Sequence, residues 1–166
     1  MNSHTRAWVT LFRELFWGRE PGSDGTFVVE QMEAIIPLLA SVDASSASRE
    51  PGPGVQTLAS HAQHTAYYVS LLNAIARGEE KRPDWEASWG RPQVDESEWN
   101  AIRVTLEWEA RTLLTWVQSG AAQPENALHA TYLWGQVAHA AFHLGSIRQI
   151  LWLIRPPYGT SSSATN

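Results

Sequence analysis

The chain has 166 residues and no cysteine, which removes several possible chemistries at once. Without cysteine it forms no disulfide bond and offers neither a thiolate metal ligand nor a cysteine nucleophile. Basic residues are also scarce, since 12 Lys and Arg stand against 17 Asp and Glu, for a net charge of −5. Nucleic-acid binding needs a basic surface, so this charge balance argues against DNA or RNA as the main partner.

Long apolar runs are missing as well. No stretch approaches the roughly 18 consecutive apolar residues of a membrane-spanning helix. Residues 1–20 lack the uninterrupted apolar core and the small-residue cleavage site of a secretory signal peptide. We therefore expect a cytoplasmic protein with no membrane partner. Its length predicts one domain with a sizeable core over residues 1–155, followed by a flexible tail at 156–166.

Alternation of apolar and polar residues is also too brief to predict a strand. Segments rich in Gly, Pro, Ser and Asn at 21–25, 45–54, 81–93 and 119–126 separate stretches with helical periodicity, which predict helices at 3–17, 26–42, 55–78, 95–119 and 126–155. Asp95 and Glu98 form a capping-box pattern, and Gly78 stands where a helix would end. The expected fold is all-α: an up-and-down four-helix bundle with an additional short N-terminal helix.

The most informative feature that is present is a pair of histidines in the apolar stretch VAHAAFHLGSIRQIL, residues 137–151. His139 and His143 are four residues apart, so a helix places both imidazoles on one face, one turn apart. The same face continues into isoleucines at 147, 150 and 154. In helix 55–78, His61 and His64 likewise fall on the apolar face. All four imidazoles are therefore expected to point into the core.

Helix depth suggests that three of these histidines meet. If short loops make helices 55–78 and 126–155 parallel, His64 lies at about the same height as His139 and His143. An isolated i, i+4 pair is more often incidental than a metal site, and a single buried histidine is usually only hydrogen-bonded. Three inward imidazoles at one height, however, are costly to bury unless a divalent metal satisfies them. For His61, a fourth ligand remains possible, but we favour a second-shell or core position.

Candidates for proton transfer are few. In the same arrangement Glu109 lies level with His64, at the edge of the apolar face of helix 95–119. It would orient a ligand histidine or act as a base, and the simpler alternative is a solvated carboxylate. Tyr67 and Tyr68 are further candidates, although aromatic residues near a bundle core usually serve packing. We expect Trp85 and Trp89 in the following loop to cover one end of the bundle rather than bind a ligand.

Three stretches together resemble the DinB-like superfamily of small helical-bundle metalloenzymes: HTAYYVSLLNAIARGE (64–79), DWEASW (84–89) and HAAFHLGSIRQIL (139–151). The resemblance covers residues 55–155. It implies a divalent metal, zinc or nickel, held by His64 before the Gly78–Glu79 pair and by the HxxxHxG histidines His139 and His143. Position 140, often acidic in relatives, is alanine here, so no acid–base role is carried over to it.

The resemblance implies two enzyme activities, an S-transferase that uses a low-molecular-weight thiol or a metal-dependent hydrolase. Three histidines leave a coordination position open for water or a thiol, and the absence of cysteine means that any thiol comes from a cofactor. The alternative is a non-catalytic, stress-associated protein in which the metal stabilises the fold. A small-molecule substrate is the expected partner, and the nearly all-round apolar last helix favours a homodimer.

Overall fold

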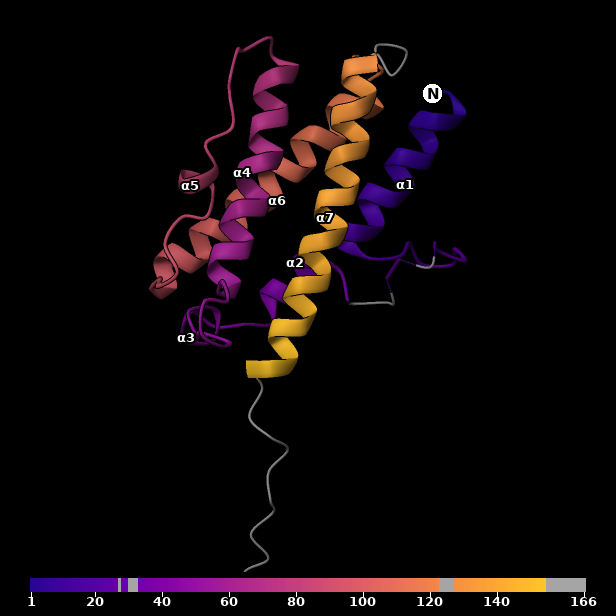
Figure 1. The fold of residues 1–166 in the computed structure, drawn as a ribbon. Helices are drawn as coiled ribbons and strands as arrows, with labels where there is room; N and C mark the ends of the chain where they lie inside the picture. Colours follow the sequence, from indigo (N-terminus) through magenta and orange to yellow (C-terminus); the bar gives the residue numbers. More distant parts are fainter. Residues whose placement is uncertain (27, 30–32, 123–126, 155–166) are drawn as a thin grey trace, which may run out of the picture.

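The computed structural model describes residues 1–26, 28–29, 33–122 and 127–154 (Figure 1). Within these residues every regular element is a helix, and no strand occurs, which confirms the all-α class. The helices are α1 (Ser3–Trp17), α2 (Ile35–Ala40), α3 (Ala44–Ala47), α4 (Leu58–Ala76), α5 (Trp85–Ser88), α6 (Glu96–Gln118) and α7 (Ala127–Ile154). The predicted tail at 156–166 lies outside the described residues.

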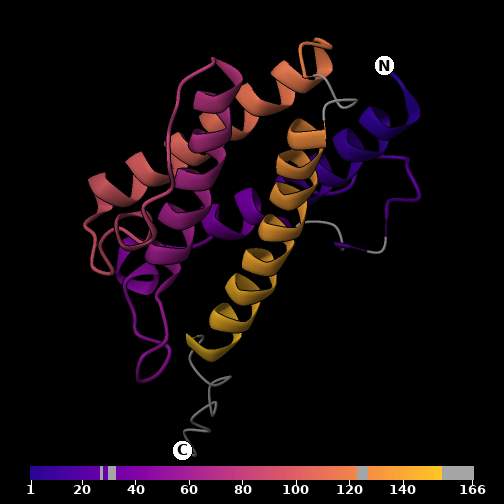
Figure 2. The same cartoon turned by 45° about the horizontal axis from the view of Figure 1, so that its top comes forward.

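The four long helices pack around a common apolar core. Helix α4 contacts both α6 and α7, and α1 contacts the same two helices from the other side (Figures 1 and 2). The core includes large side chains that are at most 2% exposed: Trp8, Phe12, Leu15, Phe16, Trp99, Leu106, Leu113 and Ile147. Because α4 is covered on two flanks, residues on several of its faces are buried, and even the polar residue Asn73 is 2% exposed.

The predicted ends of the long helices agree closely with the structure. Helix α6 begins with the predicted capping box: the Asp95 carboxylate accepts from Glu98 N–H, and the Glu98 side chain accepts from Asp95 N–H. Helix α4 ends at Ala76, and Gly78, two residues later, has a φ of +80°, in the left-handed region that glycine adopts without steric cost. The Gly78 and Glu79 N–H groups donate to the carbonyls of Ile75 and Ala74, as in a Schellman motif.

The predicted helix at 26–42 is wrong. Only Ile35–Ala40 are helical, and residues 27 and 30–32 of the predicted range lie outside the described residues. Proline at position 37 explains the difference, because it lacks an N–H and its ring collides with the carbonyl four residues earlier. In α2, Pro37 occupies the first turn, where its missing N–H costs nothing. Helix α1 is consequently one of the four long helices, and α2 is the short one.

The relative direction of the helices also differs from the prediction. After α4, residues 79–95 run back along that helix: Asp84 N–H donates to Tyr67 Oη (2.8 Å), Gln63 Nε2 to Arg91 O (2.7 Å) and Thr57 Oγ1 to Pro92 O (3.1 Å). The chain thus returns to the start of α4 before α6 begins, so α6 runs in the same direction as α4. Helix α7 then runs antiparallel to α4 (Figure 2). The parallel arrangement expected for α4 and α7 is wrong.

Among the described residues, none of the helices is both long and apolar enough to cross a bilayer.

Candidate metal centre

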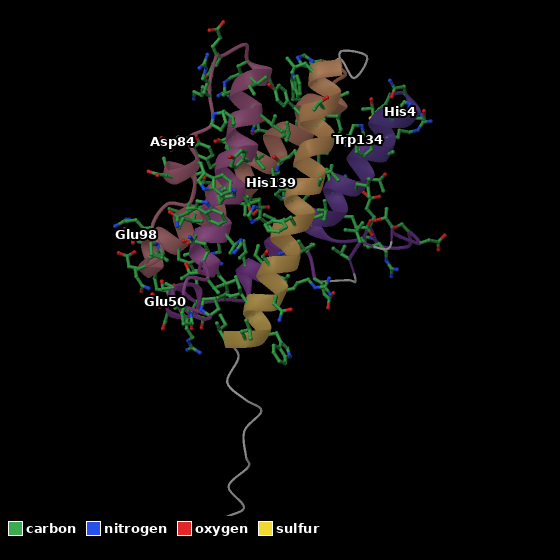
Figure 3. The ribbon with its side chains drawn as sticks, viewed as in Figure 1. His4, Glu50, Asp84, Glu98, Trp134 and His139 are labelled. Atoms are coloured by element: carbon green, nitrogen blue, oxygen red, sulfur yellow. The ribbon has the colours of Figure 1, made fainter. Side chains whose placement is uncertain are left out.

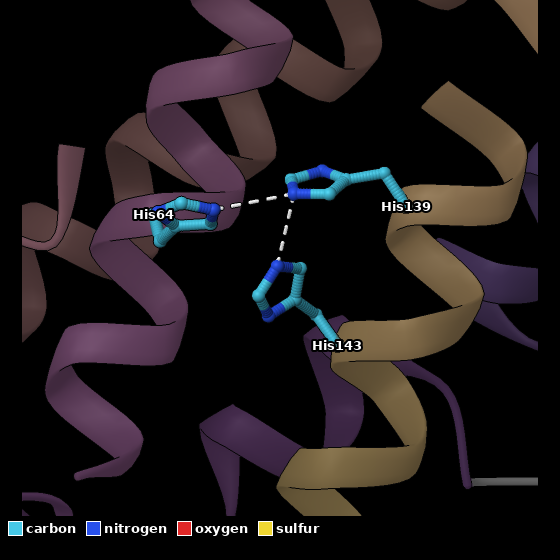
Figure 4. A group of neighbouring side chains, drawn as sticks. All are labelled: His64, His139 and His143. Carbon is cyan, nitrogen blue, oxygen red and sulfur yellow. Dashed lines mark hydrogen bonds between the residues drawn. The ribbon is translucent and has the colours of Figure 1, made fainter. Parts of the chain in front are cut away.

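The structure brings His64, His139 and His143 together between α4 and α7 (Figure 4), and Figure 3 shows where His139 lies in the whole molecule. His64 Nε2 lies 3.2 Å from His139 Nε2, which lies 3.0 Å from His143 Nε2. One ligand atom from each residue falls within 4.8 Å of the others. His64 and His143 are 0% and 1% exposed, and His139 is half-buried. The predicted convergence of these three histidines is therefore confirmed.

The pairing of residues shows why they converge although the helix direction was mispredicted. His64 faces His139, and His61, one turn earlier, faces His143, one turn later. This reversed order belongs to antiparallel helices. His139 and His143 lie near the middle of α7, so they stay close to the level of His64 whichever way that helix runs. The expected height was right because it depends weakly on direction.

Two of the three spacings between the ligand nitrogens are close to those around a single ion, and the third pair lies within 4.8 Å. Zinc–imidazole bonds of about 2.0–2.1 Å in a tetrahedron place neighbouring ligand nitrogens about 3.3–3.4 Å apart. The observed 3.2 and 3.0 Å are close to this value. Three nitrogen ligands leave at least one position of a tetrahedral ion free for another ligand, as in catalytic rather than structural zinc sites.

The hydroxyl of Ser88 fixes which nitrogen of His64 carries the proton. Its Oγ lies 2.6 Å from the Trp85 carbonyl, which can only accept, so the single hydroxyl proton is donated there. The Ser88 oxygen therefore accepts the proton of His64 Nδ1, 2.9 Å away. His64 Nε2 is left with a lone pair directed at the other two histidines. A ligand histidine is commonly held in its tautomer by such an outer hydrogen bond.

His61 lies where a second-shell residue is expected. Its Nδ1 is 2.9 Å from Nδ1 of His143, on the ring edge opposite the Nε2 that faces His139. When His143 donates this hydrogen bond, its own Nε2 lone pair is free for a metal. His139 differs from the other two, because its buried Nδ1 has no hydrogen-bond partner among the described residues.

Burial keeps the cluster uncharged at neutral pH. Desolvation lowers the pKa of His61 to about 4. Desolvation, with repulsion from His139 and His61, lowers the pKa of His64 to about 4, and desolvation with repulsion from the other three lowers that of His143 to about 3. Burial also lowers the pKa of His139. Neutral imidazoles are the form that binds metals, so no proton has to be displaced near pH 7.

Aromatic rings surround the imidazoles. Trp89 stacks on His64 with ring centroids 3.9 Å apart, and Trp85 meets the same imidazole edge-on at 5.3 Å. Tyr68 lies 4.8 Å from His64 and 4.7 Å from His139. The expectation that Trp85 and Trp89 cover one end of the bundle is wrong, since they lie on the histidine cluster instead.

Residues 79–95, which run back along α4, carry Trp85, Ser88 and Trp89 to the site. The Gln63 amide holds both the N–H and the carbonyl of Arg91. The chain passes so close that a Cβ at position 90 would collide with this amide, and Gly90, with φ of +58°, avoids the collision. This attachment places α5 over His64. Sequence reasoning missed Ser88 altogether, and the only available signal was its position between two tryptophans.

Glu109 is not brought to the histidines. Its carboxylate accepts from Asn73 Nδ2 at 2.6 Å, nine residues beyond His64 along α4. The geometric reason for choosing it fails, because α6 runs parallel to α4 and not antiparallel. Glu109 does share a surface groove of about 360 Å³ with Tyr67 and Ser88. Its predicted acid–base role stays a prediction.

A second groove, of about 430 Å³, opens on the other side of the cluster, along α7. Its apolar wall consists of Val55, Phe142, Ile150 and Leu153. The other lining residues are His61, Gly145, Ser146 and Gln149. We call this surface the α7 groove.

Comparison of the chain with models of protein families, with curated proteins and with solved structures finds no match. The chemistry of the site therefore rests on its own residues and geometry.

Proposed function

We propose that this protein is a DinB-like metalloprotein that binds one zinc or nickel ion through His64, His139 and His143, in a four-helix bundle of α1, α4, α6 and α7. One observation carries the proposal: three neutral imidazoles direct Nε2 toward a common point at metal-ligand spacing. Without an ion these nitrogens share protons in hydrogen bonds, and a cation bound by all three lone pairs takes the place of those bonds.

The residues around the three ligands support the same role. Ser88 holds the tautomer in which His64 Nε2 is free, and His61 is placed to do so for His143. Trp89 covers the face of His64 and reduces the access of water on that side. A divalent ion bound here supplies Lewis acidity and lowers the pKa of a coordinated water or thiol toward neutrality.

The proposed activity is the transfer of a low-molecular-weight thiol to an electrophile, or hydrolysis of a small substrate. The chain supplies no thiol of its own, because it contains no cysteine. The non-catalytic alternative, in which the metal only stabilises the fold, is favoured by a specific observation. Glu109, the candidate base, accepts from Asn73 and is not brought to the three histidines.

Metal analysis followed by turnover assays tests the proposal. We expect the purified chain, dialysed against zinc or nickel, to hold one ion per chain, as measured by inductively coupled plasma mass spectrometry. The loaded protein is then incubated with thiols of low molecular weight and 1-chloro-2,4-dinitrobenzene, and with ester substrates. Turnover above that of the metal-free protein supports the enzyme, and a bound ion without turnover supports the structural role. No bound ion refutes both.

A further inference from the structure

The α7 groove adjoins the candidate metal centre, and the walls of the groove are largely apolar and carry no charged side chain. We propose that it holds the uncharged, apolar tail of a small molecule whose polar head reaches the metal. This inference names the substrate class of the proposed function and rests on that function.

The groove meets the histidine cluster at His143. His61 lines the groove, and its Nδ1 lies 2.9 Å from Nδ1 of His143. Phe142 also lines the groove, and its ring centroid is 5.1 Å from that of His143. A molecule in the groove is thus separated from the proposed ion by a single imidazole. None of the three proposed ligands lines the groove, so the head of such a molecule reaches the ion by passing the His143 imidazole on the side of the half-buried His139, while its tail stays in the groove.

The apolar wall is exposed, because no element of the described chain covers it. Val55, Phe142 and Leu153 are 47%, 66% and 48% exposed. Single exposed apolar residues are common, but these three lie together in one concave surface. The volume of about 430 Å³ falls in the range of small-molecule sites, roughly 300–1,000 Å³.

No described residue that lines the groove carries a charge at neutral pH. Ser146 and Gln149 are uncharged, and Ser146 Oγ already donates to the Phe142 carbonyl at 3.2 Å. Arg148 is the one charged residue of α7, and it pairs with Glu33 at 2.5 Å instead of lining the groove. A carboxylate or ammonium on the tail would find no partner here, so the wall selects an uncharged tail.

At Gly145 the fold leaves room for a side chain that the residue does not have. A Cβ added at this position would meet nothing within 4 Å. Glycine inside a helix costs up to about 1 kcal/mol relative to alanine. Space that is unused by the fold and adjoins the site is the space in which a ligand tail fits.

Alkyl hydroxamic acids of different length test the inference. Acetohydroxamic and octanohydroxamic acids share one metal-binding head and differ only in the tail. Their affinities for the zinc-loaded protein are measured by calorimetry. Burial of a methylene strengthens binding about fourfold when complete and less in an open groove, so we expect the octano compound to bind at least tenfold more tightly.

Substitutions in α7 locate the tail. Gly145→Leu fills the groove and should remove most of the difference between the two probes. Phe142→Ala should reduce it severalfold. Gly135→Leu is the matched control, because Gly135 is also a helical glycine of α7 with nothing within 4 Å of its Cβ, but does not line the groove. It should preserve the full difference. Zinc content is measured in each variant, to separate loss of the tail contact from loss of metal.

The outcomes separate this inference from the proposed function. If neither hydroxamic acid binds and no zinc is held, the proposed function fails. If both acids bind with equal affinity, or Gly145→Leu leaves their difference unchanged, the function stands and the groove assignment is overturned. Sedimentation at the probe concentration adds one test. A dimer that excludes the octano compound, and that Gly145→Leu dissociates, would show that a second copy fills the groove, and would also overturn the inference.

Discussion

Helix α7 has two interfaces of opposite chemistry. Against α1 it meets a stack of aromatic rings, in which Trp8 lies 4.5 Å from Phe12 and Phe12 lies 4.4 Å from Phe16. The only polar atom of Trp8, Nε1, donates to the Leu133 carbonyl of α7 at 2.8 Å. Against α4 the same helix presents two imidazoles to two others. One interface buries mainly apolar area, and the other buries ligand atoms.

The contrast separates stability from binding. Burial of aromatic side chains is favourable by itself, whereas burial of imidazoles is unfavourable until a partner satisfies their nitrogens. The α1–α7 interface can therefore hold α7 in position while the α4–α7 interface stays open to a cation. Variants on the two sides of α7 should accordingly change different quantities.

The largest expected effect is on the stability side. Phe12→Ala removes a ring that is 0% exposed and stacked on two neighbours, so the free energy of unfolding should fall by about 3–5 kcal/mol. Urea denaturation of the metal-free protein measures this loss. The fraction that remains folded should still bind one ion. A loss below about 1 kcal/mol, or a folded variant without metal, would contradict the separation of the two interfaces.

The second effect is on the binding side. His64→Ala, His139→Ala and His143→Ala should each weaken zinc affinity by about 100-fold or more, because two imidazoles hold an ion far less well than three. Titration against a chromophoric chelator measures the affinity. Full occupancy in both the His139 and His143 variants would end the metal-site interpretation. Full occupancy in His64→Ala with loss in His61→Ala would assign the third ligand to His61 instead.

A smaller effect tests the outer hydrogen bonds. Ser88→Ala and His61→Ala should weaken zinc binding by about 10- to 100-fold, because the ligand tautomers are no longer held. Ser70→Ala is the control: Ser70 also donates to the carbonyl three residues earlier, Tyr67, at 2.8 Å. It should leave the affinity unchanged. Equal effects of the Ser70 and Ser88 variants would show that the hydroxyl acts on the helix alone.

The smallest effect concerns pH. Burial lowers the pKa of His64 to about 4 from an unfolded value near 6.5. Between these values the unfolded chain binds more protons, so the stability of the metal-free protein is greatest above about pH 6.5 and falls toward pH 4. The melting temperature in EDTA should be a few degrees lower at pH 5 than at pH 7. His64→Gln should reduce this decrease, and an unchanged pH dependence would contradict the assignment.

The accuracy of the sequence predictions followed the range of the interactions involved. The ends of α6 and α4 were predictable because Asp95, Glu98 and Gly78 act on backbone groups within a few residues. The helix at 26–42 was overextended although Pro37 carries a local signal against it. The pair His139 and His143 was identified from its spacing, because i, i+4 positions share a helix face in any fold.

The sequence by itself determined the four long helices, their inward faces and the imidazoles that those faces carry. The tertiary structure decided the rest. The segment 79–95 turns back along α4 through bonds to Tyr67, Gln63 and Thr57, which makes α7 antiparallel to α4 and places Ser88 and two tryptophans over His64. It also takes Glu109 to Asn73. Helix formation depends on neighbours in the chain, whereas the course of a connection depends on contacts between residues distant in sequence, which periodicity does not reveal.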